Sequence, residues 1–165
     1  MRGPDPVERR RRGDVRRSLR MANDDEGRAL QRGTAAAGAG LLVLAFATGG
    51  LLAAAMTKRI DADVPEIVAA HLNAILGCLW LVALAATLPL VSFGPAGKRR
   101  LVLATIVPAY GNWLVTVVKA FLHVTGVDLT GDHANDAVFA VLNVVVVLPS
   151  FAAAIAWTYG LARRG

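Results

Sequence analysis

Residues 65–77, PEIVAAHLNAILG, place a histidine inside a segment that is otherwise suited to lipid. No charged residue occurs between Ile67 and Ser92. A membrane span needs about 20 apolar residues, at about 1.5 Å of rise per residue, so this segment is long enough to cross a bilayer. A polar side chain at that depth must face protein or a ligand, because lipid offers no hydrogen-bond partner. His71 is therefore either a packed helix contact or the anchor of a site.

The rest of the chain repeats this apolar character in three further segments separated by short charged links. Of its 165 residues, 55% are hydrophobic and 18% are charged, a balance typical of a small multi-span membrane protein and not of a soluble domain. The predicted spans are residues 34–57, 65–93, 101–124 and 137–162. The predicted fold class is all-α, an integral membrane four-helix bundle that forms one domain over residues 34–165.

Residues 1–33 differ in kind, because they hold ten arginines and six acidic residues and show almost no apolar periodicity. Such a segment cannot bury enough surface to offset its chain entropy, so we expect a disordered basic tail. Arginines before a first span hold that end in the cytoplasm and contact anionic lipid headgroups. We therefore predict membrane lipid as the partner of the tail, and no nucleic acid.

The orientation in the cell membrane follows from lysines and arginines near the ends of the spans. The tail, the second link and the C-terminus contribute ten such residues, whereas the first link has two and the third link has none. Because positive charge favours the cytoplasmic side, both termini are predicted to be cytoplasmic.

Polar residues of the third span follow one helical stripe. They recur at steps of three and four residues, as Thr105, Pro108, Asn112, Thr116, Lys119 and His123. A stripe of this kind should face the bundle interior or another subunit. Each of three residues has two interpretations: Asn112 forms an interhelical hydrogen bond or a site, Lys119 extends to the interface or serves a site, and His123 caps its helix or binds a ligand. For Lys119 and His123 we favour the structural alternative.

Motifs of soluble enzymes are missing from the sequence. It contains no glycine-rich phosphate loop, no paired-cysteine zinc pattern, no His-Glu-x-x-His, no Gly-x-Ser-x-Gly and no Cys-x-x-Cys-His. The polar residues inside the spans are therefore the candidates for chemistry. Among them His71 stands out, because a neutral imidazole suits a haem iron or another metal.

Three short motifs resemble the styrene-oxide isomerase family: AHLNAILG at 70–77, PLVSFGPAGKRR at 89–100 and AYGNW at 109–113. The resemblance extends over about residues 65–164. It implies a multi-subunit membrane enzyme with haem b bound near a subunit interface. In that arrangement His71 is the axial ligand of the iron and Asn112 belongs to the pocket.

The sequence also departs from that family. Where the family has an asparagine one and a half turns after the histidine, this chain has Gly77. Where the third span of the family has an acid and a later tyrosine, this chain has Pro108 and Thr116. Tyr110 is a possible replacement for the phenol, although it lies on a different face of its helix. The resemblance therefore supports haem binding better than any particular substrate.

The expected reaction is the opening of a hydrophobic aryl epoxide to an aldehyde by Lewis-acid catalysis and a 1,2-hydride shift. Asn112 is the candidate that orients the epoxide, Tyr110 or Thr116 assists, and Trp80 or Trp113 borders a dry pocket. Lys119 is the candidate cofactor-binding cation for the haem propionates, together with Lys58 and Arg59.

Two other classes of function stay open. One is a non-catalytic membrane protein that binds haem or serves a structural role. The other is a small-solute transporter, which has less support because four spans without an internal repeat suit transport poorly unless several copies assemble. The expected partners are a hydrophobic small molecule, membrane lipid and further copies of the same chain.

Overall fold

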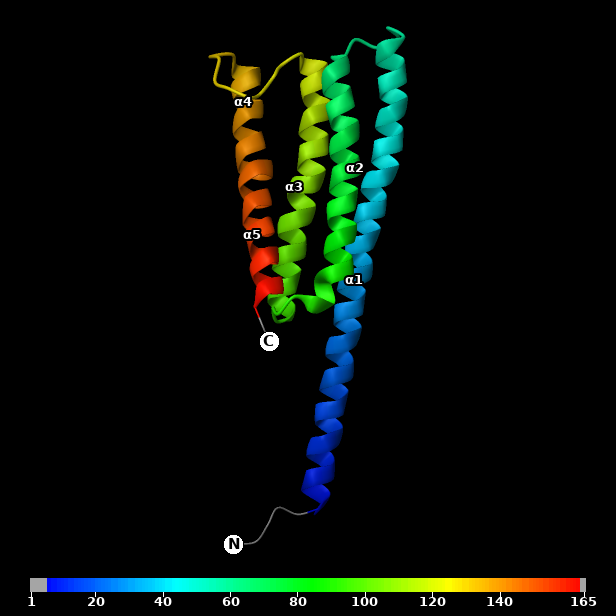
Figure 1. Cartoon of the computed structure of the whole chain (residues 1–165), viewed down its shortest axis with the longest axis vertical. Helices are drawn as coiled ribbons and strands as arrows, with labels where there is room; N and C mark the ends of the chain where they lie inside the picture. Colours follow the sequence, from blue (N-terminus) through cyan, green and yellow to red (C-terminus); the bar gives the residue numbers. More distant parts are fainter. Residues whose placement is uncertain (1–5, 164–165) are drawn as a thin grey trace.

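The computed structural model describes residues 6–163 and contains only helices and their links in that range. The elements are α1 (Pro6–Met56), α2 (Val64–Thr87), a short 3-10 turn η1 (Leu88–Leu90), α3 (Pro95–Leu122), α4 (His133–Val141), the π-helix η2 (Leu142–Val147) and α5 (Leu148–Ala162). Figure 1 shows α4, η2 and α5 as one continuous rod, so the chain forms four long helices. The predicted all-α class is confirmed.

Each of the four helices is long and apolar enough to cross a membrane. The candidate spans are Asn23–Met56, Val64–Leu90, Pro95–Leu122 and His133–Ala162. Helix α1 packs on α2, α2 packs on α3, and α3 packs on the fourth helix. The chain is therefore a multi-pass helical membrane protein, as the apolar segments predicted.

Two buried apolar clusters hold the helices together. One surrounds Leu84 and Val102 near the α2–α3 link, and the other surrounds Leu41 and Ala109. Interhelical hydrogen bonds supplement this packing. Trp113 Nε1 on α3 donates to Thr48 Oγ1 on α1 at 2.9 Å. In a bilayer such interhelical hydrogen bonds fix which helix faces are in contact.

The N-terminal tail differs from the prediction. We expected disorder through residue 33, but residues 6–33 are helical and extend α1 well beyond the bundle (Figure 1). The first span supplies a formed helix, so the tail adds turns without a new nucleation step, and its many arginines and acids are tolerated by a helix. Arg99 on α3 also pairs with Glu26 at 2.8 Å, which ties the extension to the bundle. Residues 1–5 lie outside the described range.

The helix ends agree with local sequence signals. Asp63 caps α2 by accepting a hydrogen bond from the Glu66 backbone N–H at 3.3 Å, and Pro65 lies in the first turn. Helix α3 ends at His123, which has a left-handed conformation with φ of 53° and donates its backbone N–H to the Lys119 carbonyl. The predicted capping role of His123 is confirmed.

The fourth helix contains an irregular stretch where the sequence contains proline. The π-helix Leu142–Val147 lies directly before Pro149, which has no backbone N–H for a regular helical bond. Farther along this helix, Trp157 Nε1 donates to Thr87 Oγ1 at 3.0 Å and so joins α5 to α2. The proline therefore coincides with a local widening of the helix.

Candidate functional site

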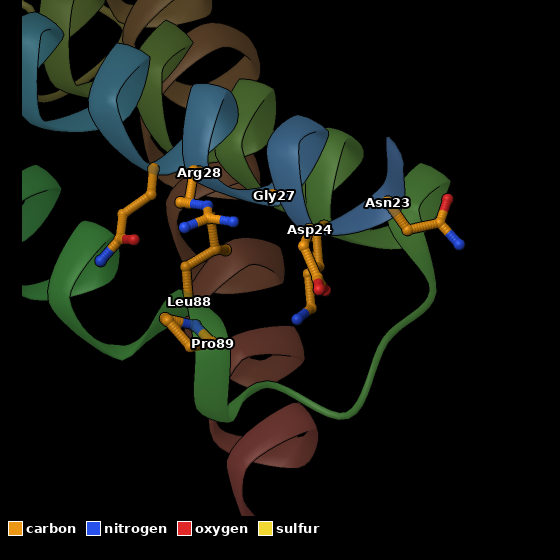
Figure 2. A pocket seen from close by; sticks show the side chains of 8 residues that line it. Asn23, Asp24, Gly27, Arg28, Leu88 and Pro89 are labelled. Atoms are coloured by element: carbon orange, nitrogen blue, oxygen red, sulfur yellow. The ribbon is translucent and has the colours of Figure 1, made fainter. Parts of the chain in front are cut away.

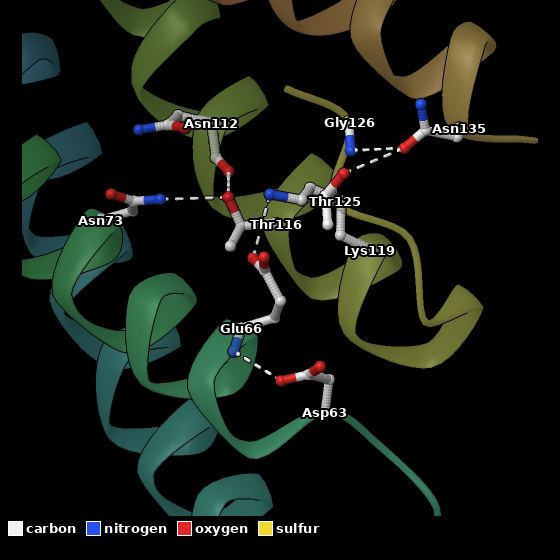
Figure 3. A network of polar contacts seen from close by, with 9 residues as sticks. All are labelled: Asp63, Glu66, Asn73, Asn112, Thr116, Lys119, Thr125, Gly126 and Asn135. Carbon is white, nitrogen blue, oxygen red and sulfur yellow. Dashed lines mark hydrogen bonds and ion pairs between the residues drawn. The ribbon is translucent and has the colours of Figure 1, made fainter. Parts of the chain in front are cut away.

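The polar stripe of α3 meets a polar stripe of α2. Thr105, Pro108, Thr116 and Lys119 are all buried, as expected for a stripe that faces the interior. The two helices run antiparallel, so polar residues from the start of α2 meet those from the end of α3 (Figure 3). The site is built along this contact.

An ion pair forms the first step of this contact. Lys119 Nζ lies 3.0 Å from Glu66 Oε2, and the two side chains are only 10% and 23% exposed. The amine is directed to Glu66 (Figure 3), and because Glu66 lies in the first turn of α2 and Lys119 in the last turn of α3, the extension of Lys119 toward the membrane interface stays a prediction. Pairing removes the need to place an isolated charge in an apolar environment.

A chain of hydrogen bonds forms the second step. Thr116 Oγ1 donates to the Asn112 backbone carbonyl at 2.7 Å and accepts from Asn73 Nδ2 at 3.0 Å. A hydroxyl has a single proton, so Thr116 has no donor left for a substrate. Thr116 therefore positions Asn73, and it does not have the assisting role that we expected.

Asn73 was not among the predicted site residues. The signal in the sequence was a strongly polar amide inside a span that lacks charge, but its partner lies 43 residues away on another helix. That partner is visible only once α2 and α3 are placed together.

A pocket of about 270 Å³ adjoins this network between α2, α3 and the fourth helix. Its polar lining residues are Asn73, Asn112 and Ser150, and its apolar lining residues include Leu76, Trp80 and Val146. Within residues 6–163 the side chains of Asn112 and Ser150 have no hydrogen-bond partner. An apolar hollow with a few converging polar groups is the usual form of a small-molecule site.

Gly77 also lines the pocket, and it lies in close contact with residues of both α1 and α3. A Cβ atom at this position would lie 2.9 Å from Leu41 Cδ1 and 3.4 Å from Ala109 Cβ. The glycine therefore permits close contact of α2 with α1 and α3. An asparagine at this position would require Leu41 to move, which gives the departure from the resembled pattern a structural basis.

His71 lies elsewhere on α2 and faces α1. Its Nδ1 lies 2.8 Å from the Ala45 carbonyl oxygen, and because a carbonyl only accepts, Nδ1 carries the proton. Nε2 has no hydrogen-bond partner among the described residues. No side-chain nitrogen or oxygen in that range is both enclosed and unpaired, so Nε2 reaches the surface of the chain.

The structure separates His71 from the pocket. His71 and Asn73 are two positions apart, and at about 100° per residue they project from nearly opposite faces of α2. The pocket lies on the side of α2 that carries Asn73, whereas Ala45 of α1 lies on the side that carries His71. A single chain therefore brings Asn73, Asn112 and Thr116 together, but not His71.

Tyr110 is also outside the pocket. Its hydroxyl donates to the Ala37 carbonyl at 2.8 Å, so the phenol joins α3 to α1. Of the two tryptophans proposed to border the pocket, Trp80 does so and Trp113 binds Thr48 instead. The catalytic assistance expected from Tyr110 has no support in this arrangement.

A larger hollow, of about 510 Å³, lies at the bundle end from which the α1 extension projects (Figure 2). Charged and amide groups of α1 line it, including Asp24, Arg28 and Asn23, opposite Leu88 and Pro89. None of the predicted site residues lines this hollow. Its charged lining suits the membrane boundary and not an apolar substrate.

The fold and the site define a class: a small four-span membrane protein with a mostly apolar pocket and an amide network between its second and third spans. The model of the styrene oxide isomerase family matches residues 30–162, which include most of the chain. The chain therefore belongs to the styrene oxide isomerase family, and the predicted resemblance is confirmed. No curated protein and no solved structure matches the chain. Family membership implies isomerase activity.

Proposed function

We propose that this protein is a haem-dependent membrane isomerase that converts a hydrophobic aryl epoxide to an aldehyde. The observation that carries the proposal is the pocket between α2, α3 and the fourth helix, which offers the unpaired Asn112 amide inside a mostly apolar lining. The family match over residues 30–162 supports the isomerase class. The reaction needs no oxidant, since one C–O bond breaks and a hydride moves to the neighbouring carbon.

The environment of His71 suits an axial ligand of haem iron. Histidines that bind metals usually donate their other ring N–H to a carbonyl or carboxylate, which fixes the tautomer, and His71 Nδ1 meets the Ala45 carbonyl in this way. Nε2 is then the free nitrogen and reaches the surface of the chain. When bound, a ferric haem supplies a Lewis acid that polarises the epoxide oxygen.

The separation of His71 from the pocket supports a homo-oligomer. Within one chain the His71 ring faces α1, whereas the Asn112 amide of α3 lines the pocket on the other side of α2. A second copy that places its pocket beside this His71 face completes a site with both groups. Haem bound by His71 would have Lys58 and Arg59, which are exposed in the link before the His71 helix, as candidate partners for its propionates. Lys119 is a weaker candidate because Glu66 already pairs with it.

The pocket residues have distinct roles in the proposed reaction. The Asn112 amide donates a hydrogen bond that orients the epoxide oxygen, and Thr116 holds the surrounding network. Trp80, Leu76 and Val146 exclude water, which would otherwise trap the ring-opened substrate as a diol. Asn112 is therefore the catalytic residue of this chain, and Thr116 is a positioning residue.

The proposed location is the cell membrane, with both termini in the cytoplasm. The N-terminal extension and the C-terminal end of α5 emerge from the same end of the bundle as the basic start of α3, which carries Lys98, Arg99 and Arg100 (Figure 1). Cysteines introduced at Ser18 and Asp132 should react with impermeant reagents from opposite sides. Reaction from the same side would contradict this orientation.

The activity is tested by supplying styrene oxide to membranes that contain the protein and measuring phenylacetaldehyde. We expect product from haem-loaded membranes and a large loss in Asn112→Leu. The matched control is Asn143→Leu, since the Asn143 amide binds only the Phe139 carbonyl of its own helix, at 2.9 Å. A haem-loaded sample that converts neither styrene oxide nor other aryl and alkyl epoxides would favour the non-catalytic haem-binding alternative.

A further inference from the structure

The Thr116 hydroxyl fixes the orientation of the Asn73 amide. Its proton is committed to the Asn112 carbonyl at 2.7 Å, so toward Asn73 it can only accept. The group of Asn73 that faces Thr116 at 3.0 Å is therefore the N–H of Nδ2, because an amide oxygen there would meet another lone pair. Figure 3 shows the Asn73 oxygen at the far end of the amide, directed away from Thr116.

In the described part of the chain, the Asn73 oxygen is the unpaired end of a side chain that lines the pocket. Asn73 lines the pocket, and Oδ1 has no hydrogen-bond partner among the described residues. It is not enclosed either, since no enclosed side-chain oxygen or nitrogen in that range is unpaired. Once a bound ligand covers it, an amide oxygen left without a donor is unfavourable by about 1–3 kcal/mol. The site is therefore best completed by a donor that enters with the ligand.

The other polar groups of the pocket can act as hydrogen-bond donors. The Asn112 amide and the Ser150 hydroxyl can both donate, which suits an epoxide oxygen that only accepts. A simple aryl epoxide has no donor and leaves the Asn73 oxygen unsatisfied. The pocket thus offers hydrogen-bond donors from Asn112 and Ser150 and an acceptor from the Asn73 oxygen.

The nearby charges indicate the kind of donor. Glu66 and Lys119 neutralise each other at 3.0 Å, so the polar contact between α2 and α3 has no net charge there. A neutral hydroxyl fits an amide oxygen in such surroundings better than an ammonium group, which would need a charged partner.

We propose that Asn73 forms a second polar subsite of this pocket, and that the preferred substrates are aryl epoxides that carry a hydroxyl group away from the epoxide ring. This inference rests on the proposed isomerase function. Asn73 is then a specificity-determining residue, and Thr116 acts through it. Sites built to bind a hydroxyl discriminate strongly against analogues that lack it, because a buried polar group is left unpaired.

The test compares 3- and 4-(hydroxymethyl)styrene oxide with the 3- and 4-ethyl analogues, which are similar in size. In the haem-loaded protein we expect kcat/KM to favour at least one hydroxymethyl isomer by about tenfold or more. Asn73→Leu should reduce that ratio to near one while product still forms from the ethyl compound. Equal kcat/KM for both members of each pair in the unmodified protein would overturn the proposal.

Thr116 variants separate positioning from a general packing effect. Thr116→Val removes the acceptor that orients the amide and should lower the hydroxymethyl preference, whereas Thr116→Ser should keep it. The matched control is Thr105→Val, a buried threonine of the same stripe whose hydroxyl binds only the Leu101 carbonyl of its own helix, at 2.9 Å. A loss of preference in Thr105→Val equal to that in Thr116→Val would contradict the positioning role.

A binding measurement keeps the subsite testable if no epoxide is isomerised. Thermal stabilisation of the detergent-solubilised full chain is compared for 3-ethylbenzyl alcohol and 1,3-diethylbenzene. Tighter binding of the alcohol in the unmodified chain, lost in Asn73→Leu, supports the subsite even where the isomerase proposal fails. Equal binding of the two compounds overturns the subsite and leaves the isomerase proposal to its own assay.

Discussion

Helix α2 has two polar faces with different architecture. The face toward α1 carries His71, which makes one hydrogen bond to a backbone carbonyl and leaves a ring nitrogen at the surface. The face toward α3 carries Glu66 and Asn73, and both are engaged by side chains of α3 within 3.0 Å. Among the described residues, His71 thus keeps one ring nitrogen unpaired, whereas Glu66 and Asn73 each bind a side chain of α3. The paired face aligns two helices and borders a pocket, whereas the His71 face leaves a ring nitrogen available for the ligand that we proposed above.

The largest expected effect concerns the His71 face. His71→Ala should abolish the Soret band of the haem-loaded protein, because Nε2 is the proposed iron ligand. The measurement is an absorption spectrum after haem supplementation, with membrane insertion verified separately. His123→Ala is the control, since His123 is exposed at the end of α3 and should leave the band intact. A band that survives unchanged in His71→Ala would exclude His71 as the ligand.

The next effect concerns the paired face. Lys119→Leu leaves Glu66 as a mostly buried charge without its partner and should lower the free energy of unfolding by about 3–5 kcal/mol. The double variant Lys119→Leu with Glu66→Leu should recover much of that loss, because no isolated charge remains. Unfolding of the detergent-solubilised protein measures both. Equal losses in the single and double variants would show that the pair is not coupled.

A smaller loss of stability is expected where α2 contacts α1 and α3 at Gly77. Gly77→Ala places a Cβ 2.9 Å from Leu41 Cδ1 and should destabilise the fold by about 1–3 kcal/mol through overpacking. Gly50→Ala is the control, because no atom lies within 4 Å of a Cβ there, and alanine in a helix should stabilise slightly. Adding Leu41→Val to Gly77→Ala should relieve part of the strain. Thermal unfolding that does not distinguish the two glycines would contradict the close contact.

The smallest effect separates a structural hydroxyl from a catalytic one. Tyr110→Phe removes the hydrogen bond to the Ala37 carbonyl and should lower stability by about 1 kcal/mol. Isomerase activity should remain, because Tyr110 does not line the pocket. A tenfold or greater fall in kcat for Tyr110→Phe, with stability corrected, would return Tyr110 to the catalytic set.

Local sequence signals were sufficient for the four spans, because an uncharged apolar run of 20 or more residues has few alternatives to a membrane helix. The polar stripe of α3 likewise indicated which face lies inside. The hydrogen-bonded pairs between helices could not be predicted from the sequence, since Asn73 and Thr116 are 43 positions apart and Tyr110 and Ala37 are 73 apart. Sequence spacing orders residues along one helix, but it does not say which neighbouring helix they meet.

The helical extension of α1 shows a different limit. Composition predicted disorder because residues 6–33 have little apolar surface to bury. The structure continues the helix because the first span has already formed it, and Arg99 pairs with Glu26 across the boundary. A segment attached to a formed helix therefore follows different energetics from the same segment in isolation.

The Glu66–Lys119 pair also bears on how the chain enters the membrane. Helix α2 alone would bring a carboxylate into the bilayer and α3 alone would bring an amine, and each isolated charge opposes insertion by a few kcal/mol. The two helices are joined by only a short link through Gly94, so they can enter together as a hairpin with the charges already matched. We therefore expect α2 and α3 to insert as a hairpin in which the Glu66–Lys119 pair is already formed.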